Sequence, residues 1–210
     1  MEASVSVTTP LSWSIKLNRI AYYFFLSFFS AVFFIASFPP FECGIFAWIG
    51  MSPFLFGLRR SNLFGAVTFS VLTGFLFFAG TFFWAGSVPV IGVRNWLLCM
   101  VLPLTLYFLV FGVLYWLTHK AFGSWLIIAA PALWTSLEYV RSNLFYLALP
   151  WNLLGHSQYQ YLPVIQIADV TGVYGISFLI VMVNQFLSQL PDLTNSTNWK
   201  ISLRGRSSGI

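Results

Sequence analysis

The chain has 210 residues, of which 59% are hydrophobic, 20% are aromatic and only 7% are charged. A water-soluble domain of this length needs far more charge to cover its surface, so the composition excludes one and indicates a helical membrane protein. The formal net charge of +5 is spread over separate segments, which suits anionic lipid headgroups and requires no nucleic-acid partner.

Six apolar stretches are candidates for membrane-spanning helices, because about 20 helical residues cross a hydrocarbon core. They are residues 20–38, 41–57, 63–85, 96–118, 121–137 and 172–190. Pro39-Pro40 separates the first two stretches, since tandem prolines end a helix. We expect these two to form a tight helical hairpin, with a kink at Ser52-Pro53 inside the second.

The positions of lysine and arginine predict the orientation, because cationic loops stay on the cytoplasmic side. With the N-terminus inside, eight of the ten fall in cytoplasmic segments: Lys16, Arg19, Arg59, Arg60, Lys120, Lys200, Arg204 and Arg206. Only Arg94 and Arg141 fall outside. The sequence therefore predicts an all-α, polytopic membrane protein with both termini cytoplasmic. Its parts would be an N-terminal segment at 1–19, a six-helix membrane domain at 20–190 and a polar tail at 191–210.

Glycine and aromatic residues alternate along the third stretch, which ends near Trp84. Gly74, Gly80 and Gly86 lie between bulky side chains, so another backbone can approach closely. Helix packing is the ordinary reason for such glycines. The alternative is a lateral opening through which an acyl chain enters.

The fifth stretch ends in a polar face. Trp134, Glu138 and Arg141 lie at positions i, i+4 and i+7, so they share one side of a helix, and Glu138 and Arg141 can neutralise each other. One interpretation is an interfacial ion pair that tethers the helix end. The other is functional: Arg141 meets a lipid phosphate, for which its planar fork is suited, while Trp134 supports the acyl region.

The segment after this helix is rich in aromatic and polar residues. Pro150, Trp151 and Asn152 fall outside the membrane, where a tryptophan either anchors the boundary or covers a lipid-binding groove. His156 is expected to be a solvated loop residue.

The last stretch is preceded by two further polar residues, Gln166 and Asp169. An aspartate at this depth must be ion-paired, hydrated or protonated. Asn184, deeper in the same stretch, is expected to hydrogen-bond to another helix.

The sequence otherwise contains no motif that is typical of catalysis or of metal or phosphate binding. Cys43 and Cys99 lie in apolar segments without a neighbour that would activate a thiol, so we expect buried structural thiols. No metal-ligand spacing or phosphate-binding glycine loop is present, and we expect no metal and no cofactor.

Several motifs occur in an order that resembles the membrane domain of apolipoprotein N-acyltransferases. They are APALW followed by Glu138 and Arg141, LPWNLLGHSQ from Leu149, PVIQIADVTGVYGISFLI from Pro163 and then Asn184. FPPF from Phe38 and the glycine-aromatic third stretch fit the same pattern.

This resemblance implies an enzyme of the bacterial inner membrane. The family moves an acyl chain from a phospholipid to the amino group of a diacylglyceryl-modified N-terminal cysteine of a lipoprotein. In the family, a nitrilase-like domain with a Glu-Lys-Cys triad carries out the chemistry outside the membrane, and it lies between two further helices. The sequence stops at Ile210 without these parts, so we expect a truncated chain that is inactive alone: a fragment, a frameshifted product or one half of a split enzyme. In the last case, its partner would be a separate chain that carries the catalytic domain.

No catalytic residue is therefore expected in the chain, and the resemblance implies positioning roles for residues on the lipid-facing rim. These are Trp84, Trp134, Glu138, Arg141, Pro150, Trp151, Asn152, Gln166, Asp169 and Tyr174. Two alternatives remain open, a scaffolding membrane subunit and a small transporter component. A transporter predicts ionisable residues near the bilayer midplane, whereas here they gather at the interfaces.

Overall fold

The computed structural model describes residues 10–144 and 148–194, and in that part of the chain every regular element is helical. The helices are α1 (Pro10–Ala36), α2 (Ala47–Gly50), α3 (Ser52–Arg60), α4 (Leu63–Thr81), α5 (Gly92–Asn95), α6 (Leu102–Phe122), α7 (Leu126–Asn143), α8 (Leu162–Ile165) and α9 (Ala168–Thr194). Shorter helical turns lie between them at Gly44–Phe46 (η1), Phe83–Ser87 (η2), Trp96–Val101 (η3), Gly123–Trp125 (η4) and Leu154–Gln158 (η6). The predicted all-α fold is confirmed.

Three helical stretches in the described residues are long and apolar enough to cross a membrane. They are Leu63–Thr81, Gly92–Phe122 and Ala168–Asp192, and the apolar helix Ala21–Ala36 is shorter. The stretches predicted at 63–85, 96–118 and 172–190 coincide with these three. Six crossings and the orientation of the termini stay predictions.

The stretch predicted at 41–57 is a broken helix. α2 ends at Gly50 and α3 begins at Ser52, so the chain breaks beside the predicted Ser52-Pro53 kink. The buried side chain of Asn184, on α9, covers the break: its Oδ1 accepts hydrogen bonds from the backbone N–H of Met51 (2.8 Å) and of Ser52 (2.9 Å). Its Nδ2 donates to the carbonyl of Ala47 (2.8 Å). The prediction that Asn184 bonds to another helix is confirmed.

The fifth helix begins and ends later than its apolar stretch. The prediction was 121–137, whereas α6 continues to Phe122 and α7 runs from Leu126 to Asn143. Gly123, at φ 50°, ends α6, because a positive φ suits glycine. Beyond Leu137 the helix continues through polar residues, of which Glu138 and Arg141 point into the protein and are buried.

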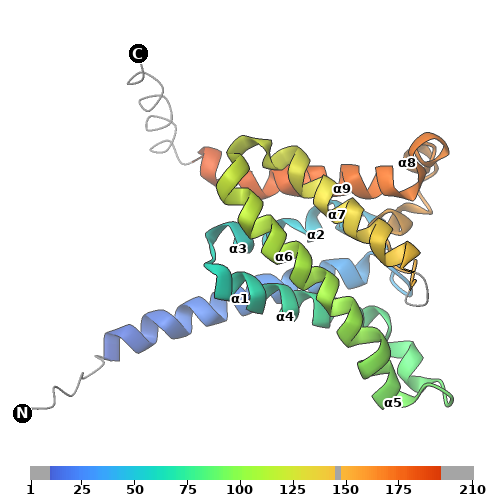
Figure 1. Ribbon diagram of the computed structural model, residues 1–210, viewed down its shortest axis with the longest axis horizontal. Coiled ribbons are helices and arrows are strands. Elements are labelled where there is room, and N and C mark those ends of the chain that lie inside the picture. Colours follow the sequence, from blue (N-terminus) through green and yellow to red (C-terminus); the bar gives the residue numbers. More distant parts are fainter. Residues whose placement is uncertain (1–9, 145–147, 195–210) are drawn as a thin grey trace, which may run out of the picture.

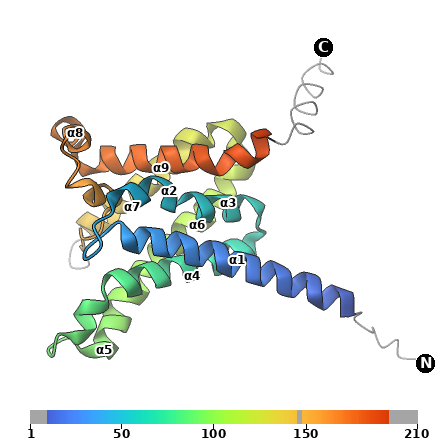
Figure 2. The ribbon, with the colours of Figure 1, turned by 180° about the vertical axis from the view of Figure 1, so that it is seen from behind.

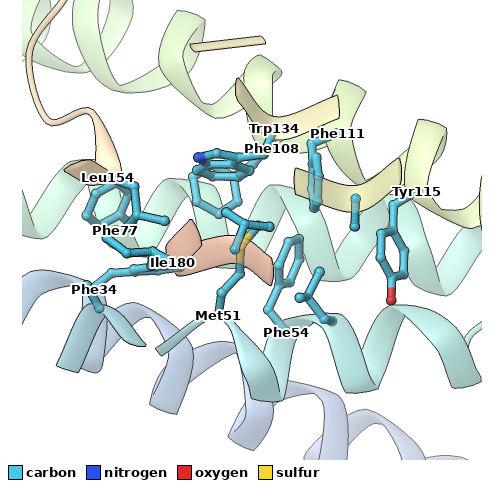
Figure 3. Close-up of a cluster of buried hydrophobic side chains, with 14 of the residues drawn as sticks. Phe34, Met51, Phe54, Phe77, Phe108, Phe111, Tyr115, Trp134, Leu154 and Ile180 are labelled. Atoms are coloured by element: carbon cyan, nitrogen blue, oxygen red, sulfur yellow. The ribbon is translucent and has the colours of Figure 1, made fainter. Parts of the chain in front are cut away.

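An aromatic cluster forms the centre of the bundle (Figure 3). The ring of Phe108, on α6, contacts rings from three other helices: Phe34 of α1 at 6.2 Å between centroids, Phe54 of α3 at 5.6 Å and Phe77 of α4 at 5.9 Å. Trp134 of α7 meets it edge-on at 5.1 Å. Because Trp134 belongs to this core, the polar face of α7 is fixed against the centre of the bundle.

Two glycines allow α4 and α6 to pack closely. A Cβ on Gly74 would lie 2.7 Å from the Cβ of Phe108, and a Cβ on Gly112 would overlap the Oγ of Ser70. Helix packing therefore accounts for Gly74, as the ordinary interpretation predicted.

The helices define two ends of the molecule (Figures 1 and 2). α5 and α8 lie at one end, which we call the α5/α8 end. At the opposite end, the α3/α6 end, the last turn of α3 meets the last turn of α9, where Arg59 and Arg60 contact Asp192 at 2.5 and 2.6 Å. The described chain begins and finishes toward this second end (Figure 1).

Candidate functional site

The polar face of α7 is buried at the α5/α8 end of the bundle. Trp134, Glu138 and Arg141 are only 9%, 3% and 4% exposed. The predicted helical spacing therefore does bring the three side chains together, but inside the protein and not on its outer surface.

Glu138 holds the loop after α7 in place. Its Oε1 accepts hydrogen bonds from the indole N–H of Trp134 (3.0 Å) and from the backbone N–H of Leu154 (2.7 Å). Leu154 is the first residue of η6, so the carboxylate joins α7 to the segment that carries Trp151 and Asn152. The other oxygen, Oε2, is buried and has no hydrogen-bond partner among the described residues.

Arg141 likewise uses only one of its two terminal nitrogens for a hydrogen bond within the described residues. Its Nη2 donates to the carbonyl of Asn152 at 3.3 Å, and its guanidinium carbon lies 5.6 Å from the centre of the Phe78 ring. Its Nη1 is buried without a hydrogen-bond partner in the described part of the chain. A buried guanidinium donor without an acceptor is costly, which makes it a candidate for binding a ligand oxygen.

Glu138 and Arg141 do not form the expected ion pair. Within the described residues, the nitrogen–oxygen contacts of 4.0 Å or less join Arg59 and Arg60 to Asp192, and none joins Glu138 to Arg141. The direct interfacial ion pair considered from the sequence is therefore wrong. The carboxylate Oε1 is instead bound by the indole N–H of Trp134 and the backbone N–H of Leu154, and Oε2 has no hydrogen-bond partner among the described residues.

Three neighbouring hollows meet around these side chains. A small cavity of about 20 Å³, the Arg141 cavity, is lined by Glu138, Arg141 and Asn152 together with aromatic residues of α4 and α6. It has room for about one water-sized group. An apolar hollow of about 550 Å³ between α6 and α7, the lateral groove, shares Tyr107 and Leu137 with it.

The third hollow, of about 340 Å³, is an aromatic pocket that shares Asn152 with the Arg141 cavity. Trp84 and Trp151 line it, with 6.1 Å between their ring centroids, and both are about half exposed. Asn152 has a φ of 53°, which asparagine tolerates better than most residues, and this conformation turns the chain into η6.

The remaining candidate residues lie around this centre or apart from it. Tyr174 packs edge-on against Tyr139 of α7 at 5.6 Å. Pro150 is exposed beside Trp151. Gln166 and Asp169 are also exposed, and the structure does not bring them into the three hollows. Their predicted role at the membrane side of a cleft stays a prediction.

The residues that hold η6 against its neighbouring helices were not predicted from the sequence. Gly155 donates its backbone N–H to Ser177 Oγ at 2.8 Å, and a Cβ on Gly155 would lie 2.5 Å from the carbonyl of Val173. Gln158 is buried, accepts a hydrogen bond from the indole N–H of Trp48 at 2.9 Å and donates one to the carbonyl of Gly44 at 2.7 Å. The available signal was the isolated glycine in LPWNLLGHS, since such a glycine marks close backbone approach.

His156, in η6, keeps an exposed edge, as expected. Desolvation of the rest of the ring, with the nearby charge of Arg141, lowers the pKa of His156 below its ordinary value, so the ring is neutral at pH 7. The expectation of buried thiols is wrong, because Cys43 and Cys99 are both exposed. Cys43 lies in the loop before η1, and Cys99 faces the lateral groove from η3.

The family model and the similar proteins that match this chain all carry the same family name. Residues 30–186 match the model of the "Apolipoprotein N-acyltransferase N-terminal domain" family. Apolipoprotein N-acyltransferase of Geobacter metallireducens is 37% identical over 168 residues, which cover 77% of this chain and 32% of the relative.

Two more distant relatives carry the same name. That of Chlorobaculum tepidum is 29% identical over 171 residues, covering 77% of this chain and 30% of the relative. That of Pasteurella multocida is 25% identical over 178 residues, covering 83% of this chain and 34% of the relative. The chain thus spans about a third of the length of the curated relatives that it matches.

Proposed function

The chain belongs to the apolipoprotein N-acyltransferase family, and from this we propose that it is the membrane domain through which such an enzyme positions its phospholipid donor. The reaction would transfer an acyl chain from a phospholipid to the N-terminal amine of a diacylglyceryl-cysteine in a lipoprotein. The location would be the bacterial inner membrane. A nitrilase-like domain, on a separate chain or elsewhere in the same protein, would supply the covalent chemistry.

One observation carries this proposal. Arg141 Nη1 is buried without a partner among the described residues and lines a small cavity that shares residues with an apolar groove and with an aromatic pocket. A phospholipid combines the same three features, because it has acyl chains, a phosphate and a polar headgroup. A phosphate oxygen would accept from Nη1 in the Arg141 cavity, and an acyl chain would lie in the lateral groove.

The other residues of the rim would hold this arrangement in place. Glu138 and Trp134 fix the position of η6 and the floor of the cavity through the hydrogen bonds described above. Trp84 and Trp151 would contact the headgroup or the lipoprotein, while Asn152, beside Pro150, orients Arg141 through its carbonyl. Tyr174 would support α7 from behind, and Gln166 and Asp169 would lie at the outer edge. These are positioning residues, and they contribute through alignment of the donor.

An acylation assay tests the proposal. Vesicles would contain the chain, a diacylated lipoprotein peptide and phospholipid, with and without a chain that carries the nitrilase-like domain. With that domain present, we expect Arg141→Gln to lower kcat/KM for the phospholipid by about ten- to a hundred-fold, the usual loss for one hydrogen bond to a charged group. Arg94→Gln is the matched control, because Arg94 is an exposed arginine of α5.

A second variant separates loss of the site from loss of the fold. Trp151→Ala removes a side chain that is 49% exposed, so its loss should weaken turnover without unfolding the bundle. Activity unaffected by either substitution would contradict the proposed site. Absence of acylation under both conditions would contradict the function and favour a scaffolding subunit, and solute flux through the vesicles would favour a transporter component.

A further inference from the structure

A further hollow, the basic cavity, lies at the α3/α6 end of the bundle, away from Arg141. Its volume is about 830 Å³, which is within the roughly 300–1,000 Å³ of ordinary ligand pockets. α1, α4 and α6 form its walls, and Phe64, Phe69 and Leu72 give it an apolar side along α4. Phe64 is 78% exposed, so this wall is open at the surface of the protein.

Cationic side chains surround the polar side of the basic cavity. Lys120 lies over the ring of Trp116, with Nζ 4.0 Å from its centre, and no carboxylate lies within 4.0 Å of it in the described chain. Arg60 also lines the cavity and contacts Asp192 through one nitrogen, yet its side chain is 49% exposed. Of the two cations that line the cavity, Lys120 is the one without a carboxylate partner among the described residues.

The polar wall is formed before any ligand arrives. Trp116 donates its indole N–H to the carbonyl of Ser61 at 3.1 Å, and Asn62 Oδ1 caps α4 by accepting from the N–H of Gly65 at 2.8 Å. The capped first turn of α4 therefore forms part of the cavity wall. Little reordering is needed for an anion to bind beside Lys120.

We propose that the basic cavity binds an anionic phospholipid of the adjoining leaflet, with its phosphate at Lys120 and Arg60 and an acyl chain along Phe64 and Leu72. Basic pockets between membrane helices recognise anionic headgroups in this way. An open apolar wall selects a lipid over a free phosphate, since only a lipid covers both sides of the cavity. The site is at the opposite end of the helices from Arg141, so it does not depend on the proposed acyl-donor role.

Native mass spectrometry of the delipidated chain tests this site, with phosphatidylglycerol as the anionic probe and phosphatidylcholine as the neutral one. We expect the wild-type chain to prefer phosphatidylglycerol and Lys120→Gln to reduce that preference about five-fold, the usual effect of one cation near a lipid surface. Arg94→Gln removes an exposed cation at the other end and should leave the preference unchanged. Thr68→Trp should fill the basic cavity and weaken binding of both lipids.

Three results would overturn the inference. They are equal binding of the two lipids by the wild-type chain, a Lys120→Gln variant that behaves like Arg94→Gln, and unchanged binding by Thr68→Trp. An excess of glycerol phosphate serves as the competitor. Release of the bound lipid by that competitor would also contradict the inference, because it would show recognition of the phosphate without the apolar wall.

Discussion

At the scale of single residues, the site depends on two buried polar side chains that the protein satisfies in part. Glu138 uses one oxygen to hold Trp134 and Leu154, while Arg141 uses one nitrogen to hold Asn152. The second atom of each group is buried and has no partner in the described chain. A buried polar atom without a partner is normally satisfied by water or a ligand, and an oxygen of the proposed donor lipid would satisfy Arg141 Nη1.

Asn184 shows the opposite arrangement, because its amide is fully used. It joins α9 to both sides of the break between α2 and α3 and also donates to the carbonyl of Ile180. We expect Asn184→Leu to lower the free energy of unfolding by about 2–4 kcal/mol, since buried N–H and carbonyl groups would lose their partners. Chemical denaturation in detergent measures this effect.

Gln189→Leu is the control for that experiment, because Gln189 is a half-buried amide on the same helix. An equal loss of stability in the two variants would show that Asn184 has no special role at the break.

At the scale of helices, small residues set how closely α4 and α6 approach. Gly112 leaves no room for a Cβ beside Ser70. We expect Gly112→Ala to destabilise the bundle by about 1–3 kcal/mol, the usual cost of overpacking. Gly86→Ala should change stability less, because its Cβ would lie 3.4 Å from the ring of Trp96. Thermal unfolding of the two variants side by side compares them, and equal stability would contradict close packing at Gly112.

The helices were predictable from the sequence to the extent that apolar length defines them. α4 was predicted at 63–85 and runs from Leu63 to Thr81, and the break beside Ser52-Pro53 was expected from proline chemistry. α7 was placed too early because hydropathy stops at Leu137, whereas the helix continues through residues that are polar but buried.

The candidate site was predictable only as a face of one helix. The i, i+4, i+7 spacing correctly grouped Trp134, Glu138 and Arg141. It gave no information on which atoms pair, because Leu154 donates from a loop that lies 16 residues along the chain from Glu138. Long-range contacts of this kind depend on tertiary structure, as does the burial of Gln158 against η1.

At the scale of the whole molecule, the two ends of the bundle differ in character. The α5/α8 end carries the hollows around Arg141, and the α3/α6 end carries Arg59, Arg60 and Lys120. The positive charge at the second end agrees in sign with a cytoplasmic side. The predicted topology would therefore place the Arg141 cavity toward the outer face of the membrane.

Reporter fusions test that orientation. We expect alkaline phosphatase, which is active only outside the cytoplasm, to be inactive when fused after Ser61 and active when fused after Val90. Val90 is 91% exposed at the turn before α5, so a fusion there should not disturb the bundle. Activity at Ser61 together with inactivity at Val90 would reverse the proposed orientation.

The most direct test of the central claim is photo-crosslinking of a phospholipid that carries a photoreactive group on its acyl chain, with the labelled peptides identified by mass spectrometry. We expect label on α6 and α7 along the lateral groove, near Leu106, Val110 and Val140. Arg141→Gln should reduce this label several-fold, whereas Arg94→Gln should not. Label spread evenly over all helices would contradict the claim that this site holds the donor lipid. Label in the groove that is unchanged by Arg141→Gln would contradict it as well.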